Sequence, residues 1–203
     1  MELIGEVDFW ESKYNQGTTG WDIGQAAPPL ATLLNSPNAP LPGKTVILGC
    51  GRGYDALLFA SYGFEVIGVD FAPSAIAAAQ SSAAKANLEV NFLQRNIFDL
   101  TTEFPEYFDY VIEHTCFCAI APVLRNQYLD LVSSLLKPQR NLIGIFFTHN
   151  RPGGPPFGSS LQEICNLFST KFEILNLELV TNSVPARENE EHLGIFKRKK
   201  FLI

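Results

Sequence analysis

The sequence predicts a doubly wound α/β fold of the Rossmann-like type, built on a mostly parallel seven-stranded sheet. Three observations lead to it. Short apolar segments alternate with helical patterns along most of the chain. The last two apolar segments follow each other without a helix, which favours an antiparallel hairpin strand at one sheet edge. A glycine-rich turn, Gly49–Gly53, joins the first strand to a helix.

Each element is justified by its apolar spacing and by its proline and glycine residues. Pro73 stands in the first turn of a helix, where no backbone N–H is needed, and Gly63 stands where a helix ends in a left-handed cap. In chain order we expect helices 7–16 and 28–35, strand Thr45–Leu48, helix Tyr54–Tyr62, strand Glu65–Val69, helix Pro73–Ala86, strands Leu88–Leu93 and Phe108–Glu113, helix Val123–Leu136, strand Asn141–Phe147, helix Leu161–Ser169, and strands Phe172–Leu179 and His192–Ile203.

Length and charge limit the possible classes of protein. The 203 residues, 46% of them hydrophobic, suit a single domain that spans 1–203. The net charge of −6 argues against a nucleic-acid partner, and we interpret the basic run 197–200 as the exposed end of the last strand. Neither a signal peptide nor an apolar run long enough to cross a membrane is evident, so we expect a cytoplasmic protein. A monomer is the default expectation.

The four cysteines do not form a recognisable metal motif. Cys116 and Cys118 are too close together for a zinc knuckle, and no second pair completes one. We therefore expect no metal site, and buried reduced thiols instead.

The glycine-rich turn predicts a cofactor site. It is followed by a helix whose first N–H groups can face a negative group. The next strand leads to Asp70, whose carboxylate can accept hydrogen bonds from ribose hydroxyls. These features suit S-adenosyl-L-methionine (AdoMet). They also suit a dinucleotide, because Gly51, Gly53 and Ala56 satisfy the looser GxGxxA pattern.

Several segments together resemble the thiol and halide methyltransferases, a branch of the thiopurine S-methyltransferase superfamily. They occur in the order of that family and cover nearly the whole chain. The segments are Gly17–Gln25, Gly49–Ala56, Cys118–Ile120 with Pro122 and Arg125, and Gly153–Phe157. The resemblance implies an AdoMet-dependent methyltransferase with a lid over the cofactor formed by residues 1–35.

The resemblance also assigns the cofactor contacts. Trp10, Tyr14 and Trp21 would close over AdoMet, since a sulfonium cation is attracted to aromatic faces. Without the resemblance, Trp10 and Tyr14 fit ordinary packing of an amphipathic helix equally well. Among the remaining expected contacts, the glycine turn would contact the methionine end of AdoMet, and Asp70 would bind its ribose. The 96–97 pair would contact the adenine, and the 113–115 segment would lie beneath the sulfonium. The residues are Gly49, Gly51, Asp70, Asn96, Ile97 and Glu113.

Three side chains are expected on the nucleophile side. Arg125 would help to admit an anion, with a plain surface arginine as the alternative. His114 replaces the tyrosine usual in the family and would act as a positive charge, as a base for a neutral thiol, or only as a hydrogen-bonded side chain. Phe157 would form a pocket wall. Asn96 likewise replaces the usual aspartate but keeps one acceptor for an adenine amino group.

The expected reaction is methyl transfer to a small nucleophile, namely halide, hydrosulfide, thiocyanate or a small thiol. Such a reaction is an in-line displacement, and an anionic nucleophile requires no general base. The alternatives are methylation of aromatic thiols or metalloid oxyanions, a nicotinamide-dependent reductase, and an AdoMet-binding protein without catalysis.

Overall fold

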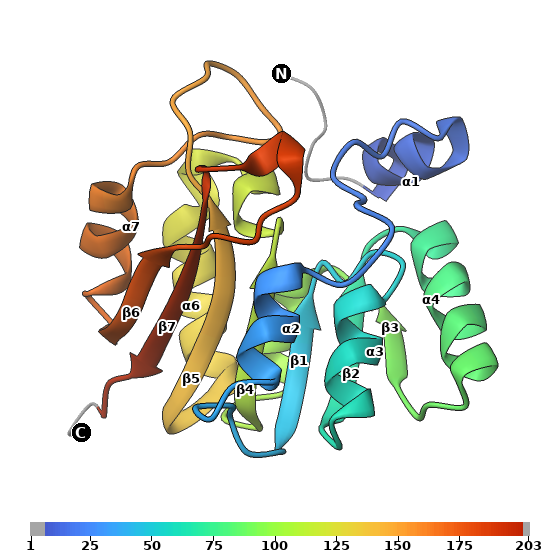
Figure 1. The fold of residues 1–203 in the computed structure, drawn as a ribbon, viewed down its shortest axis with the longest axis horizontal. Helices are drawn as coiled ribbons and strands as arrows, with labels where there is room; N and C mark the ends of the chain where they lie inside the picture. The colour runs from blue at the N-terminus through green and yellow to red at the C-terminus, as the bar shows by residue number, and fades with distance from the viewer. Residues whose placement is uncertain (1–6, 201–203) are drawn as a thin grey trace.

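The computed structural model describes residues 7–200, and a seven-stranded sheet forms its centre (Figure 1). The strands are β1 (Lys44–Leu48), β2 (Glu65–Asp70), β3 (Asn91–Gln94), β4 (Phe108–His114), β5 (Leu136–Phe147), β6 (Phe172–Leu179) and β7 (Glu191–Arg198). Their order in the sheet is β3-β2-β1-β4-β5-β7-β6. Among the described strands, β7 alone runs in the direction opposite to the other six, so the predicted fold class is confirmed.

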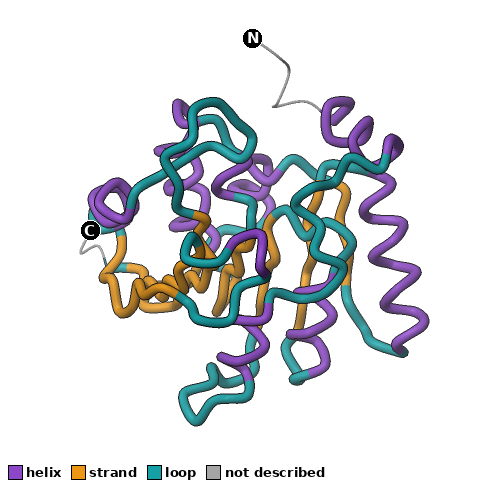
Figure 2. The backbone as a smooth tube through the Cα atoms, turned by 45° about the horizontal axis from the view of Figure 1, so that its top comes forward, coloured by secondary structure: helices purple, strands orange, loops and turns teal. Residues whose placement is uncertain are grey.

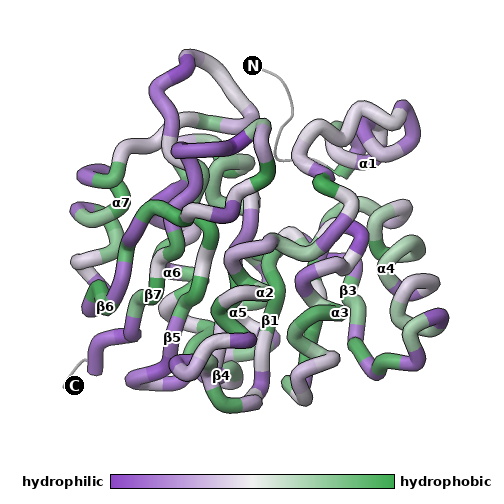
Figure 3. The backbone as a smooth tube through the Cα atoms, viewed as in Figure 1, coloured by the Kyte–Doolittle hydropathy of each residue, from purple (hydrophilic) through white to green (hydrophobic). Residues whose placement is uncertain are grey.

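Helices cover both faces of the sheet. The α-helices are α1 (Val7–Gln16), α2 (Pro28–Leu34), α3 (Tyr54–Ser61), α4 (Pro73–Ala86), α5 (Leu100–Glu103), α6 (Arg125–Leu135) and α7 (Leu161–Phe168). Short 3-10 turns occupy Ile97–Asp99, Phe117–Ala119, Pro122–Leu124 and Pro185–Arg187. One buried cluster joins α2, α3 and α4 to the sheet, and a second joins α5, α6 and α7. Hydrophobic residues accordingly mark β1 and α3 in Figure 3.

Helix α1 lies above the carboxyl ends of the parallel strands, and it packs against α4. The backbone N–H of Ser74, in the first turn of α4, donates to the Glu11 carboxylate at 3.0 Å. Loops also gather over these strand ends (Figure 2). The predicted site therefore lies below segments from both halves of the chain. Residues 1–6 of the expected lid lie outside the described residues.

Two strand starts were predicted wrongly. The strand expected over Leu88–Leu93 begins at Asn91, because Asn87 adopts a left-handed conformation and Leu88 donates its N–H to Ala83. These contacts cap α4 and use up the start of the predicted strand. Strand β5 begins at Leu136 rather than Asn141, directly after α6, and pairs with β4 across a register shift.

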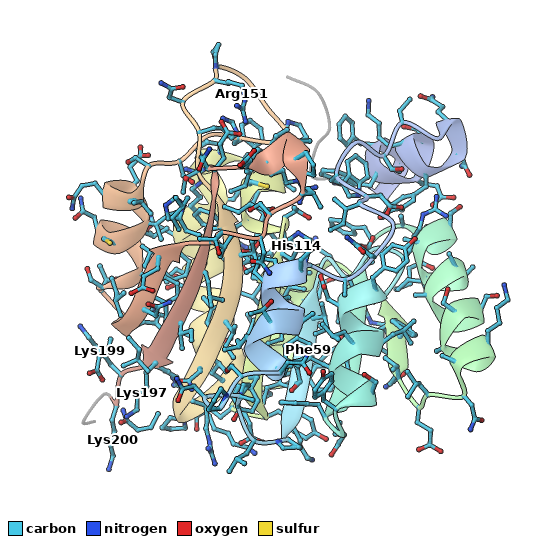
Figure 4. The ribbon with its side chains drawn as sticks, in the orientation of Figure 1. Phe59, His114, Arg151, Lys197, Lys199 and Lys200 are labelled. Atoms are coloured by element: carbon cyan, nitrogen blue, oxygen red, sulfur yellow. The ribbon has the colours of Figure 1, made fainter. Side chains whose placement is uncertain are left out.

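The basic run 197–200 lies where β7 ends, away from His114, which lies near the middle of the view (Figure 4). Lys199 and Lys200 are exposed, as expected, but β7 ends at Arg198, so the strand predicted to continue through them stops earlier. The part of that predicted strand over 201–203 lies outside the described residues. Within residues 7–200, no helix is long and apolar enough to span a bilayer.

Candidate active site

A pocket opens where β1 and β4 end, beneath the segment that follows α1. The glycine turn forms its floor, and the aromatic N-terminal segment forms its roof. The lining residues are Tyr14, Trp21, Asp22, Ile23, Gln25, Gly49, Cys50, Gly51, Arg52, Tyr54, Asp55, His114 and Thr115. Five of the predicted site residues, from distant segments of the sequence, therefore meet here: Tyr14, Trp21, Gly49, Gly51 and His114.

Two glycines of the turn line the pocket, and both positions require glycine for steric reasons. Gly49 and Gly51 have φ angles of 61° and 53°, in the region that disfavours other residues. A Cβ on Gly51 would lie 3.1 Å from the Tyr14 hydroxyl oxygen, and one on Gly49 would lie 3.2 Å from the Cys116 Cβ. The backbone can thus approach a bound group closely, between the aromatic roof and the end of β4.

Asp70 ends β2 beside this turn and is 9% exposed. Its Oδ2 accepts the Gly51 N–H at 2.8 Å, and its Oδ1 accepts the Ala72 N–H at 2.9 Å. Burial raises the pKa of this carboxyl, and the backbone hydrogen bonds oppose that rise. Each oxygen can still accept a second hydrogen bond. The carboxylate therefore supports the turn and retains acceptor capacity for hydroxyl groups.

The aromatic residues of the roof contact one another edge to face. The Trp21 ring lies 5.3 Å from that of Trp10 and 5.8 Å from that of Tyr14. Arg52, from the glycine turn, lies over the Tyr14 ring and pairs with Asp22 at 2.8 Å. Trp10 itself does not line the pocket but packs behind Trp21. The N-terminal segment is thus joined to the glycine turn by both ring and ion contacts.

Glu113 lies directly below the loop that follows β4 and is 1% exposed. One carboxyl oxygen accepts the Phe117 N–H at 2.7 Å, and the other has no partner among the described residues. Burial raises the pKa of Glu113 to about 7. The side chain orders the pocket wall from beneath but does not line the pocket.

This raised pKa predicts a pH-dependent contribution to stability. A carboxyl with a folded-state pKa of about 7, against an ordinary 4.5, stabilises the fold fully only below pH 4.5 and loses that contribution as the pH rises through 7. Glu113→Gln removes the ionisation. We expect the variant to gain up to about 3 kcal/mol on the wild type between pH 4.5 and 8, since one pKa unit corresponds to about 1.4 kcal/mol. Urea unfolding at several pH values measures this difference, and a constant difference would contradict it.

His114 has hydrogen-bond partners at both ring nitrogens. Nδ1 lies 2.9 Å from an Asp55 carboxylate oxygen, and Nε2 lies 3.1 Å from an Arg187 nitrogen. Arginine can only donate, so Nε2 accepts and Nδ1 carries the proton of the neutral ring. Burial opposes protonation, but the Asp55 carboxylate raises the pKa of His114 above its ordinary value. Of the expected roles, the hydrogen-bonded one matches this geometry directly.

Arg125 and Phe157 lie away from the pocket lining, on the far side of the loop after β4. The Arg125 guanidinium donates to the Gly158 carbonyl at 2.9 Å and lies over the Phe117 ring. The Phe157 N–H donates to the Cys118 carbonyl at 2.6 Å. Arg125 therefore holds the 153–158 loop against the loop after β4. Its expected contact with an anion stays a prediction.

Asn96 and Ile97 follow β3, on the opposite side of Asp70 from His114 in sheet order. The Asn96 side-chain oxygen accepts the Phe98 N–H at 3.0 Å and caps a 3-10 turn. Ile97 is buried. An adenine contact by Asn96 would use the second lone pair of that oxygen.

Sequence reasoning missed Arg187 and Glu191 and gave Asp55 no role. Arg187 donates to Glu191 at 3.1 Å as well as to His114. Asp55 lies 59 residues from His114 in the sequence, and Arg187 lies 73 residues from it. The only signal in the sequence was Asp55, a carboxylate in the first turn of the helix after the glycine turn.

Comparison with known proteins supports one family. The family model described as thiopurine S-methyltransferase matches residues 5–202. Thiocyanate methyltransferase 1 of Arabidopsis thaliana is 32% identical over 200 residues, covering 95% of this chain and 86% of the relative. Probable thiol methyltransferase 2 of the same plant is 33% identical over 196 residues, covering 93% and 84%.

The fold is shared with a solved methyltransferase structure. The 1,6-didemethyltoxoflavin-N1-methyltransferase of Burkholderia thailandensis, solved with bound S-adenosylhomocysteine, has a TM-score of 0.77 and 20% sequence identity. The alignment covers 96% of this chain and 87% of that one.

The fold and the site therefore define a Rossmann-like, AdoMet-dependent methyltransferase. The chain belongs to the thiopurine S-methyltransferase family. The close-approach glycines, the carboxylate of Asp70 and the aromatic roof fit this cofactor. The nicotinamide-dependent alternative, based on Gly51, Gly53 and Ala56, is wrong.

Proposed function

We propose that this enzyme methylates a small sulfur or halide nucleophile that reaches the pocket already as an anion. Hydrosulfide, thiocyanate, halides and the thiolate form of small thiols belong to this class. AdoMet, when bound, supplies an electrophilic methyl group and a neutral leaving group. The protein's part is to bind, orient and exclude water.

The observation that carries this proposal is the lack of an available base among the described residues that line the pocket. Both nitrogens of His114 have partners. The Asp55 oxygens accept from Ala27 and bond His114, and Asp22 pairs with Arg52. Burial raises the pKa of Tyr14, which keeps its phenol protonated. A nucleophile that still carries its proton would find no unpaired carboxylate or imidazole in this lining to accept it.

The relatives support the same class of nucleophile. Their names specify thiocyanate and thiol, at 32% and 33% identity over more than nine-tenths of this chain. Under the proposal, Trp10, Tyr14 and Trp21 close the cofactor site, and Asp70 binds the ribose. Phe157 walls the nucleophile side, where Arg125 holds it in place.

The proposal is tested by supplying AdoMet with one nucleophile at a time and measuring methylated products. The panel is hydrosulfide, thiocyanate, iodide, an aromatic thiol and selenite. We expect methanethiol, methyl thiocyanate or methyl iodide at a higher kcat/KM than any product of the last two compounds. Faster turnover of the aromatic thiol or the oxyanion would favour the alternative activities of the family. Binding of AdoMet with no product from any nucleophile would favour a protein without catalysis.

The pH dependence of the reaction tests the lack of a base. For thiocyanate we expect kcat/KM to vary little between pH 6 and 9. For an alkyl thiol it should rise only near the thiol's own pKa, about 8.5 for an unperturbed thiol. His114→Gln should lower the rate without changing the shape of either profile. A step near neutral pH in the thiol profile that disappears in His114→Gln would show that His114 is a base.

A further inference from the structure

Four charged or polar side chains from four elements form a buried polar network beside the pocket. Asp55 comes from α3, His114 from β4, Arg187 from the turn before β7, and Glu191 from β7. Their side chains are 12%, 9%, 8% and 3% exposed, in that order. Figure 4 shows His114 at the centre of the molecule, below the turn that contains Arg187. Buried charges at this depth require partners.

Two members of this network, Asp55 and Arg187, bond to one short segment of the N-terminal region. The Ala27 N–H donates to Asp55 Oδ1 at 2.7 Å. Arg187 Nη2 donates to the Trp21 carbonyl at 2.6 Å. Residues 21–27, here called the roof segment, are thus held at both of their ends. Between those ends, Asp22, Ile23 and Gln25 line the pocket.

The polar network connects the roof segment to the floor of the pocket. Asp55 lies in the first turn of α3, directly after the glycine turn. His114 joins Asp55 to Arg187, and Arg187 also pairs with Glu191. Lifting the roof segment would break the hydrogen bonds from Ala27 to Asp55 and from Arg187 to Trp21. The buried carboxylate and the buried guanidinium would then each lack a partner. Hydrogen bonds to charged groups contribute about 1.5–3 kcal/mol each, so the closed arrangement is favoured.

We propose that Asp55 and Arg187 are positioning residues that hold the roof segment closed over the cofactor site, with His114 as the link between them. The roof segment contains Trp21, whose ring contacts Tyr14 and Trp10. Closure of residues 21–27 therefore sets the aromatic roof as well. None of these positions needs to touch the nucleophile for this role.

The experiment measures release of S-adenosylhomocysteine, which does not depend on the identity of the nucleophile. Trp10 and Trp21 are the only tryptophans in the chain, so their fluorescence reports on the roof. We expect Arg187→Met to speed dissociation by about tenfold or more, the effect of losing one charged hydrogen bond. The fluorescence change on binding should shrink. Arg187→Lys keeps the charge and places its donors on one nitrogen, so it cannot reach all the partners of the guanidinium and should restore part of both.

Arg198→Met is the matched control. Arg198 is also largely buried, pairs with Glu106 at 2.8 Å and donates to the Leu136 carbonyl, but at the far end of β7. It should leave dissociation and fluorescence unchanged. Wild-type dissociation in Arg187→Met would overturn the proposal.

Hydrogen exchange gives a second measurement if Arg187→Met does not fold. In Asp55→Asn, the peptide covering 21–27 should exchange faster while peptides from β5 keep wild-type rates. Unchanged exchange over 21–27 would equally overturn the proposal. Failure to detect any methylated product would leave these readouts intact, so the two proposals fail separately.

Discussion

Asp70→Asn is expected to weaken binding of S-adenosylhomocysteine by roughly 10- to 100-fold. Both oxygens of Asp70 accept backbone N–H groups, from Gly51 and from Ala72. An asparagine side chain has only one acceptor oxygen, so one buried N–H would face an amide NH2 group. This mispairing lowers the stability of the turn. A ribose hydroxyl would in addition lose a charged acceptor, and a hydrogen bond to a charged group contributes about 1.5–3 kcal/mol, where each 1.4 kcal/mol is about tenfold in affinity.

Isothermal titration with S-adenosylhomocysteine measures this effect. Asp109→Asn is the control, because Asp109 also accepts a backbone N–H, from Lys44 at 3.0 Å. It lies near the start of β4, at the opposite ends of the strands from the glycine turn. The control should bind as the wild type does. Equal affinity in Asp70→Asn and the wild type would remove Asp70 from the cofactor site.

Phe146→Ala is expected to have the largest effect on stability, about 3–5 kcal/mol. The Phe146 side chain is fully buried in β5 and has ring contacts with three other phenylalanines. Its ring centroid lies 5.7 Å from that of Phe117 and 5.4 Å from those of Phe168 and Phe196. Truncation would open a cavity between the sheet, α7 and the wall of the pocket.

Chemical denaturation of the variant measures this loss. Leu175→Ala, at a side chain that is 50% exposed on the edge strand β6, is the control and should change stability by under about 1 kcal/mol. A loss of similar size in both variants would mean that the aromatic cluster does not stabilise the fold as its packing suggests.

The local signals in the sequence predicted most of the fold. Helix α4 begins at Pro73 and β6 spans Phe172–Leu179, both as expected, because proline position and apolar runs are local properties. The start of β3 was wrong because Asn87 forms a left-handed cap, which its residue type permits but does not require. Strand β5 was predicted too short because its first residues, Leu136–Arg140, combine a helix end with polar side chains.

The site was predictable where residues lie at strand ends and not where they pair across the fold. Gly49 and Gly51 follow β1 and Asp70 ends β2, and doubly wound sheets place such positions together. Arg187 lies in a short turn with no periodic pattern around it. Its burial follows only from contacts with Trp21, His114 and Glu191, which the three-dimensional structure brings together.

Labelled methyl transfer tests the central claim most directly. The enzyme is incubated with AdoMet carrying a deuterated methyl group and with hydrosulfide or thiocyanate, and the sealed headspace is analysed by mass spectrometry. We predict a volatile product that carries the intact deuterated methyl group and an equal amount of S-adenosylhomocysteine. The Asp70→Asn variant should form it far more slowly at the same AdoMet concentration. Cofactor binding without any labelled product, or product formation that does not respond to Asp70→Asn, would contradict the account.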